Sequence, residues 1–335
     1  MGKICFFCGS NKVIKKGLKQ GKQRWLCKTC GHIFTPSSRI KDSQVIELYS
    51  QGNLTVRQIA TQLKVNERTI YRHLAKCDKV TARNNAPGSV IAMMDTSYWG
   101  WNFGVVAIKD HISGEMLWHK FINRKERVDD YVEGVRALEK DGHKIICIVS
   151  DGLKGLRERL SGYRYQYCQF HQLQTIKHKL TNHPKLPASI ELLDISRLLC
   201  RTDKESFEGV MNEWFVRWEA FIKERSTDRN GRSHYTHKNL RSAYLSLKRN
   251  MPYLWTFYNN IELGIPNTNN EMESLFSWLK RKLNIHNGMS LERRKMLIER
   301  LFMRASQADK GLRTISGTQM SYNQKVPVFR YLFVI

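Results

Sequence analysis

The sequence lacks any run of about 18 apolar residues, the length that a membrane-spanning helix requires. Its first residues also lack the basic and apolar segments of a secretory signal. We therefore expect a cytoplasmic protein that does not enter a membrane. Cysteines rarely form disulfides in such a reducing compartment, so the eight cysteines of the chain need another role.

Acidic residues are scarce as well. The chain has 30 Asp and Glu against 56 Lys and Arg, which gives a formal net charge of +26. Such an excess predicts a polyanionic partner and favours nucleic acid over a membrane surface or a role in solubility alone. Residues 1–88 contain 17 of the basic and 4 of the acidic residues, so half of the net charge lies in about a quarter of the chain. We expect this first region to make the strongest DNA contacts.

Four cysteines form two C-x2-C pairs separated by 18 residues: Cys5, Cys8, Cys27 and Cys30. This spacing is typical of a tetrahedral zinc site, whereas the alternative is four buried thiols. Four thiolates leave no open coordination position, so one zinc ion would be structural. We expect residues 1–40 to form a zinc ribbon that folds only when it binds the metal.

Residues 57–74 resemble a helix-turn-helix, which places a DNA-binding domain at 41–77. Asn66 is a suitable N-cap for the second helix, whereas Lys64 occupies a turn position where glycine is common. The alternative is a helical hairpin that contacts protein. The residues predicted to face DNA lie off the apolar side of the second helix: Arg68, Thr69, Arg72 and His73.

The length of 335 residues suits two or three domains, and a linker at 78–88 separates the first region from a larger one at 89–310. Hydrophobic periodicity predicts strands at 89–97, 101–109, 115–122, 144–150 and 164–170, with helices at 127–141 and 152–160. Three strands followed by alternating helices and strands are expected of an α/β, ribonuclease-H-like mixed sheet. The tail at 311–335 carries no recognisable signal.

Three acids occupy positions that suit a metal-dependent site. Asp95 and Asp151 end apolar runs, and Glu273 lies on the polar face of a predicted helix. Glu271 falls on the far edge of that face, so the two glutamates cannot point at the same site. Oxygen-only ligands select Mg²⁺ or Mn²⁺, and two ions roughly 3.5–4 Å apart could activate water and stabilise the leaving oxygen at a phosphodiester. The alternative for the helix is an ordinary solvated face.

The larger region resembles the Mutator-like branch of bacterial insertion-sequence transposases with a DDE catalytic core, and the likeness spans about residues 89–305. The motifs that carry it are the segment around Asp95, Asp151-Gly152-Leu153-Lys154-Gly155-Leu156, Cys168-x2-His171 and Thr268-Asn269-Asn270-x2-Glu273-Ser274-Leu275. The resemblance implies that Asp95 and Asp151 are the catalytic aspartates, that Glu273 is the glutamate, and that Asn270 is its motif companion.

The interval of 122 residues between Asp151 and Glu273 implies an inserted domain. Helical spacing predicts an all-helical insertion at about 173–264, with helices at 188–201, 204–224 and 235–249. Its tryptophans are expected in the core, and its basic residues could hold DNA. Cys168 and His171 are interpreted as packing or DNA-positioning residues, and Lys280 and Arg281 as contacts to the DNA backbone or solvated residues.

The resemblance thus implies a nucleoid-associated transposase that cleaves transposon ends and joins them to target DNA, both as double-stranded DNA. Transposases commonly pair two ends, so a homo-oligomer is expected. Two alternatives remain open at this point: a DNA-binding regulator with an inactive nuclease-like core, and a site-specific nuclease without strand transfer.

Overall fold

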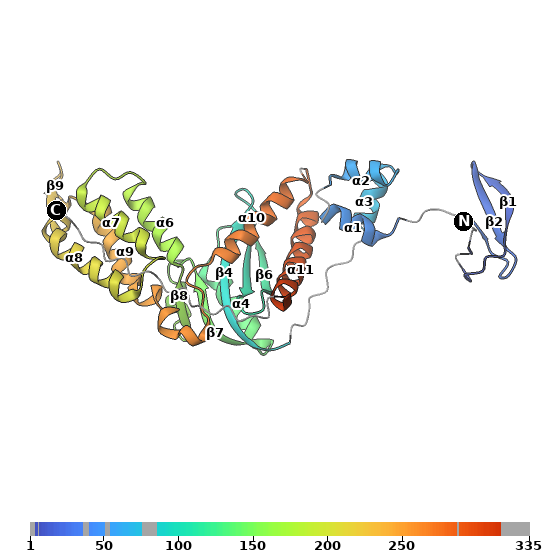
Figure 1. The fold of residues 1–335 in the computed structure, drawn as a ribbon. Coiled ribbons are helices and arrows are strands. Elements are labelled where there is room, and N and C mark those ends of the chain that lie inside the picture. The colour runs from blue at the N-terminus through green and yellow to red at the C-terminus, as the bar shows by residue number, and fades with distance from the viewer. Residues whose placement is uncertain are drawn as a thin grey trace. The chain divides into compact units, whose positions relative to one another are not determined.

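The chain divides into two compact units, Met1–Asp78 and Lys79–Ile335 (Figure 1). The computed structural model describes residues 4–5, 7–35, 40–50, 54–75, 86–286 and 288–315. Most of the expected linker (78–85) and the tail from residue 316 lie outside the described residues. Within the described part of the chain, no helix combines the length and apolar character needed to cross a membrane.

The first unit contains a small antiparallel sheet in the order β1-β2-β3 and three helices. Its elements are β1 (Val13–Lys19), β2 (Lys22–Cys27), β3 (Ile33–Phe34), α1 (Asp42–Ser50), α2 (Val56–Gln62) and α3 (Glu67–Ala75). Helix α2 begins with a capping box between Thr55 and Gln58. The expected cap of α3 is present, because Asn66 Oδ1 accepts a hydrogen bond from Arg68 N at 2.8 Å. Lys64 has the left-handed backbone expected in the turn, with φ at +53°.

The second unit is built on a five-stranded sheet in the order β6-β5-β4-β7-β8. The first three strands pair antiparallel, whereas β4, β7 and β8 run parallel. Its elements up to the insertion are β4 (Ser89–Tyr98), β5 (Gly104–Asp110), β6 (Met116–Ile122), α4 (Val128–Lys140), β7 (Lys144–Ser150), α5 (Leu156–Arg159) and β8 (Arg164–Tyr167). The predicted mixed α/β sheet is therefore confirmed. Three bounds were wrong by three residues or more: β5 begins at Gly104, α5 begins at Leu156, and β8 ends at Tyr167 because a helix starts at Gln169.

Helices cover both faces of this sheet. Helix α4 packs on one face, where Gly134 is required because a Cβ would lie 2.5 Å from Ile108 and 2.7 Å from Trp118. Helices α10 (Asn270–Asn284) and α11 (Leu291–Ile315) cover the other face. Side chains alternate between faces along a strand, so β4 presents its apolar residues to both layers. The central strands are consequently almost fully buried.

The helical insertion joins β8 to α10. It contains α6 (Gln169–Leu180), α7 (Pro187–Leu198), α8 (Lys204–Lys223), β9 (Arg225–Thr227), β10 (Ser233–Tyr235), α9 (Lys238–Leu254) and a 3-10 helix η1 (Tyr258–Leu263). The three predicted helices are confirmed with shifts of a few residues. The β9–β10 hairpin was not predicted, so the insertion is not entirely helical, and its first helix starts at Gln169 and not near 173.

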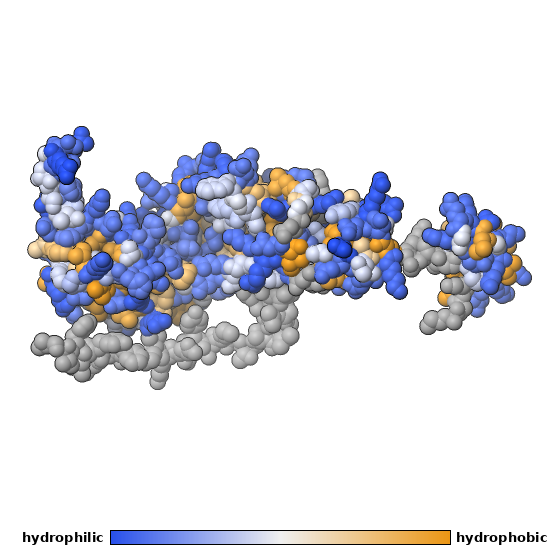
Figure 2. Space-filling model, turned by 90° about the horizontal axis from the view of Figure 1, so that it is seen from above, coloured by the Kyte–Doolittle hydropathy of each residue, from blue (hydrophilic) through white to orange (hydrophobic). Residues whose placement is uncertain are grey.

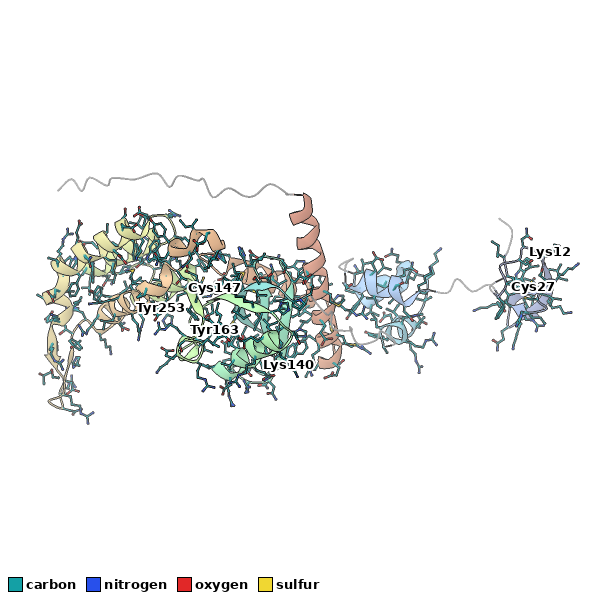
Figure 3. The ribbon with its side chains drawn as sticks, turned by 90° about the horizontal axis from the view of Figure 1, so that it is seen from below. Lys12, Cys27, Lys140, Cys147, Tyr163 and Tyr253 are labelled. Carbon is teal, nitrogen blue, oxygen red and sulfur yellow. The ribbon has the colours of Figure 1, made fainter. Side chains whose placement is uncertain are left out.

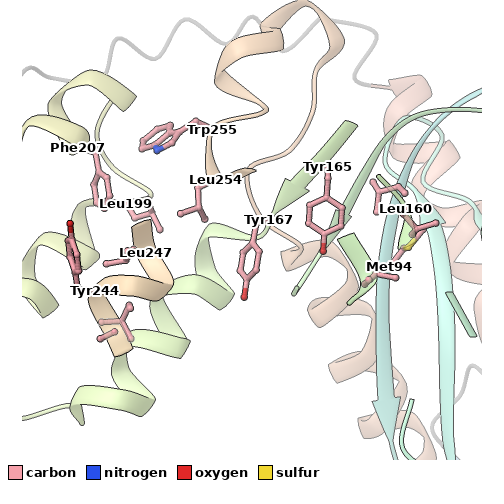
Figure 4. Packing of buried hydrophobic residues seen from close by; sticks show 14 of the residues in the cluster. Met94, Leu160, Tyr165, Tyr167, Leu199, Phe207, Tyr244, Leu247, Leu254 and Trp255 are labelled. Carbon is pink, nitrogen blue, oxygen red and sulfur yellow. The ribbon is translucent and has the colours of Figure 1, made fainter. Parts of the chain in front are cut away.

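One hydrophobic core runs from the sheet into the insertion (Figure 4). Tyr165 and Tyr167 on β8 lie between Met94 of the sheet and Leu254 at the end of α9. Of the three tryptophans expected in the core, Trp214 and Trp255 are buried, at 2% and 0% exposed, whereas Trp218 is half-buried at its edge. The insertion is therefore packed continuously with the sheet.

Candidate active site and metal centres

Asp95 and Asp151 lie at the same edge of the sheet, because β4 and β7 are parallel neighbours. Asp95 is near the end of β4, and Asp151 directly follows β7. Asp95 lies opposite Ala107 of β5, so their side chains are on the same face of the sheet. Lys109 is two residues after Ala107 and therefore also on this face, and its Nζ donates to Glu271 of α10. The side chain of Asp95 is therefore on the face of the sheet that α10 covers.

The backbone after Asp151 is fixed by a glycine. Gly152 has φ at +85°, and a Cβ there would lie 2.0 Å from the ring of Tyr167. Gly152 N also donates to Ser150 Oγ at 3.2 Å, and that hydroxyl is bound to the Tyr165 hydroxyl. These contacts hold the turn that presents Asp151.

Cys168 and Asn269 connect the three segments that carry the acids. Cys168 N donates to Ser150 O at 2.9 Å, immediately before Asp151. Asn269 N donates to Cys168 Sγ at 3.2 Å, and Asn269 Nδ2 donates to Met94 O at 2.9 Å, immediately before Asp95. Asn269 is also the N-cap residue of α10, the helix that carries Glu273. We call these two residues together the bracket, because their hydrogen bonds join β4, β7 and α10.

The electrostatics of Asp95 agree with this convergence. Burial, followed by repulsion from Asp151, raises the pKa of Asp95 to about 8, although the Thr96 backbone N–H opposes the shift. Repulsion from Glu126 and Glu273 raises this pKa further. Asp151, Glu126 and Glu273 therefore lie close enough to Asp95 to repel its carboxylate.

A cation would relieve this repulsion. Within the described residues, Glu273 Oε1 and Asn269 Oδ1 are buried and have no hydrogen-bond partner. His171 Nε2 lies 3.5 Å from Glu273 Oε1, which is an ion-pair distance but not a hydrogen bond. Carboxylate and amide oxygens are the ligands that Mg²⁺ and Mn²⁺ prefer. The donor set thus fits a hard divalent cation.

The two glutamates of α10 have different partners, as expected from helical geometry. Glu271 Oε2 accepts from Lys109 Nζ at 2.8 Å, and its Oε1 lies 2.7 Å from His111 Nδ1. Although burial raises the pKa of Glu271, hydrogen bonds from His111 and Lys109 outweigh it and lower that pKa to about 2. Glu271 holds α10 against β5, whereas Glu273 faces the other acids.

Glu126 is an acidic neighbour of the site that the sequence did not reveal. Its carboxylate accepts from the Tyr131 hydroxyl, which lies 2.8 Å from Thr96 Oγ1. Its backbone N donates to the Tyr98 hydroxyl at 2.7 Å. Burial raises the pKa of Glu126, and Asp151 contributes to the shift. Glu126 precedes α4 without any pattern that distinguishes it from other acids in loops.

The remaining predicted residues of this region have different surroundings. Asn270, expected as the companion of Glu273, is exposed, whereas its neighbour Asn269 is fully buried. Cys168 is buried, and burial raises its pKa to about 11, as expected for a packing residue. Lys280 and Arg281 are exposed on α10.

In the first unit, the four cysteines form one cluster. Their sulfur atoms all lie within 4.8 Å of one another, with Cys5 and Cys30, and Cys8 and Cys27, 3.6 Å apart. Zn–S bonds of about 2.3 Å place tetrahedral sulfurs about 3.8 Å apart, so the cluster can hold zinc. Among the described residues it is the single such group, so Asp95, Asp151 and Glu273 do not form one.

The predicted DNA-facing residues of α3 differ in exposure. Arg68 and Arg72 are exposed, and Thr69 is half-buried. His73 is mostly buried and its Nδ1 is paired with Asp42 of α1, so it packs within the unit.

Comparisons with known proteins give only distant likenesses. No protein-family model and no curated protein matches the chain. Among solved structures, the Drosophila P element transposase strand transfer complex matches with 10% identity over 83% of this chain and 93% of that chain, with a TM-score of 0.32. The Mos1 strand transfer complex matches with 14% identity over 55% of this chain and 77% of that chain, with a TM-score of 0.18. These scores are too low to carry weight, so the assignment depends on the site itself.

Proposed function

We propose that the chain is a DNA transposase of a bacterial insertion sequence, with a ribonuclease-H-like DDE core of the Mutator-like type. Asp95, Asp151 and Glu273 are its catalytic acids. The observation that carries the proposal is the bracket, which ties the strands before Asp95 and Asp151 to the helix that carries Glu273. The strand order β6-β5-β4-β7-β8 supports the ribonuclease-H-like core.

The three acids would hold two Mg²⁺ or Mn²⁺ ions. Bound there, the ions supply an activated water and charge stabilisation for in-line displacement at a phosphodiester. Asn269 and Cys168 act through the acids as positioning residues, and Glu271 fixes the helix on which Glu273 lies.

The reaction has two stages at the same site. Hydrolysis at the transposon end frees a 3′-hydroxyl, and this hydroxyl then attacks target DNA. Lys280 and Arg281, exposed on the helix of Glu273, contact the DNA backbone during both stages.

The first unit would recognise the transposon ends. A zinc ion on Cys5, Cys8, Cys27 and Cys30 stabilises the ribbon, and α2–α3 act as a helix-turn-helix. Arg68 and Arg72 are the residues of α3 best exposed to a major groove. The chain would work as a homo-oligomer, because two ends must be brought together.

The test is cleavage and joining of the element's own terminal DNA in Mg²⁺ or Mn²⁺. We compare the native chain with Asp151→Asn, Glu273→Gln and the control Glu262→Gln, an exposed acid of η1. We expect cut ends and joined products from the native chain and the control, and neither product from the two site variants, with DNA affinity retained.

Other outcomes separate the alternatives. Cut ends without joined products would identify a site-specific nuclease. Sequence-specific binding without any cut would identify a regulator with an inactive core. Activity that survives Glu273→Gln would refute the assignment of the third acid.

A further inference from the structure

A short β-hairpin projects from the insertion between α8 and α9. Strands β9 and β10 pair in register from Arg225 with Tyr235 to Thr227 with Ser233. Most of its residues are exposed, and Figure 3 shows the hairpin extending beyond the neighbouring helices. A two-stranded hairpin has little stability by itself, and this one contributes no residue to the hydrophobic core. Packing of the fold does not explain it.

The hairpin is nevertheless stiffened at both ends. At its tip, Asp228 Oδ1 accepts from Asn230 N and Arg232 N, each at 2.8 Å. At its base, two guanidinium groups lie over the Tyr235 ring, that of Arg225 at 4.7 Å and that of Arg241 at 4.0 Å from the ring centroid. A rigid exposed hairpin is suited to binding, because little conformational entropy is lost when a partner arrives.

The charge of the hairpin indicates the chemistry of that partner. Residues 225–241 contain five Lys or Arg and one acid, Asp228, whose carboxylate is occupied by the turn. Arg229 and Arg232 near the tip are exposed, and Figure 2 shows the projection as mainly hydrophilic. The partner is therefore a polyanion.

A cavity of about 460 Å³ lies at the base of the hairpin. Lys179, Lys185 and Lys238 line it, together with the starts of α7 and α9. In the described structure no side chain caps the start of α9, so its first N–H groups are available to an anion. Ser189, which is only 5% exposed, also lines the cavity. A phosphate group fits these donors.

We propose that the β9–β10 hairpin and this basic cavity form a second surface for duplex DNA, separate from the first unit and from the catalytic acids. The hairpin lies in a groove and the cavity takes a backbone phosphate beside it. A major groove about 12 Å wide admits a two-stranded ribbon of this kind. The choice of DNA as the polyanion rests on the proposed function.

The test uses the full chain with two charge-removing variants, Arg229→Ala/Arg232→Ala and Lys185→Ala/Lys238→Ala. These four side chains are exposed, so their removal leaves the core intact. The matched control, Lys140→Ala/Lys144→Ala, removes two exposed charges at the end of α4 and the start of β7, at the opposite edge of the sheet from the acids. Affinity for terminal duplex is measured by fluorescence anisotropy over a range of salt.

For each site variant we expect binding on the order of tenfold weaker at about 0.1 M salt, with the slope of log K against log salt reduced by about 2. The control should keep the native affinity and slope. Hydroxyl-radical footprinting should show that protection is lost away from the cleavage position.

Native affinity and slope in both site variants would overturn the surface, while native cleavage in the same samples would leave the transposase assignment standing. An equal loss in the control would also overturn it, because net charge alone would then explain the effect. A change of oligomeric state with unchanged DNA binding would make the hairpin a protein contact and overturn the proposal. Hairpin-dependent binding without any metal-dependent cleavage would support the surface and refute the enzyme.

Discussion

Replacing Asp95 by asparagine should stabilise the metal-free protein. The Asp95 carboxylate lies near Asp151, Glu126 and Glu273, and their repulsion destabilises the folded state. Asparagine has the same shape and can still accept the hydrogen bond that Thr96 N donates to Asp95 Oδ1 at 2.7 Å. The substitution therefore removes a charge without removing a contact.

The sign follows from proton linkage. The pKa of Asp95 rises from 3.8 to about 8 on folding, so the folded chain holds this proton more tightly than the unfolded chain. The free energy of unfolding of the native protein therefore falls as pH increases from about 4 to about 8, and the asparagine variant escapes this loss. One pKa unit corresponds to about 1.4 kcal/mol, which sets an upper limit of about 6 kcal/mol. We expect about 2–3 kcal/mol, because an effective dielectric constant of about 20 is typical even of buried sites and weakens the repulsion.

The assay is thermal unfolding at pH 4, 6 and 8 in chelated buffer and again with Mg²⁺ or Mn²⁺. At pH 8 the variant should melt roughly 5–10 °C above the native chain, and at pH 4 the two should coincide. Added cation should raise the melting temperature of the native chain and leave the variant almost unchanged.

Glu271→Gln is the matched control because its sign is opposite. The pKa of Glu271 is lowered to about 2 by His111 and Lys109, so this acid adds stability at pH values above about 4 that is lost as pH falls toward 2. Its removal leaves Lys109 buried without its carboxylate and should cost about 2 kcal/mol at pH 7. If Asp95→Asn destabilised the protein at pH 8 while Glu271→Gln behaved as expected, repulsion among the acids would be the wrong description of the site.

Three further substitutions test other parts of the molecule. Asn269→Ala removes the hydrogen bond to Met94 O and should therefore lower kcat about 10- to 100-fold with little change in DNA affinity. Single-turnover cleavage and fluorescence anisotropy measure the two quantities, and an equal loss of DNA affinity would contradict a positioning role. Glu126→Gln removes a negative charge near Asp95 and should raise the Mg²⁺ concentration for half-maximal cleavage several-fold. An unchanged Mg²⁺ titration would show that Glu126 does not contribute to binding the ions. Cys8→Ser should abolish zinc binding and unfold the ribbon, while the melting temperature of the second unit stays constant. Zinc content is measured by elemental analysis, and retained stoichiometric zinc would refute the four-cysteine site.

The sequence predicted the features that depend on local periodicity. Asp95 and Asp151 were found because each follows an apolar run, and the polar face of α10 that carries Glu273 was predicted from helical spacing. The same spacing distinguished Glu273 from Glu271, and the structure gives Glu271 a different partner, Lys109. Each of these predictions needs only the geometry of one element.

Features that depend on contacts between distant segments could not be predicted. Asn269 and Asn270 are adjacent in the sequence, and only the approach of Met94 O to α10 shows that Asn269 is the buried one. Glu126 reaches the site through Tyr131, which lies on a helix whose position over the sheet no local pattern specifies. The β9–β10 hairpin was missed because its strands have three residues each, too few for an alternating pattern.

The continuous core that joins the sheet to the insertion limits how this chain can be divided. Residues 173–264 look like a detachable module in the sequence, yet removing them would expose Tyr165 and Tyr167 to solvent. It would also remove Leu254, whose carbonyl accepts hydrogen bonds from Gln166 and Gln169. A truncated core would therefore be a poor reagent for crystallisation or activity assays. Fragments of the chain are better cut between the two units, near residue 78, so that the insertion is kept with the acids it separates.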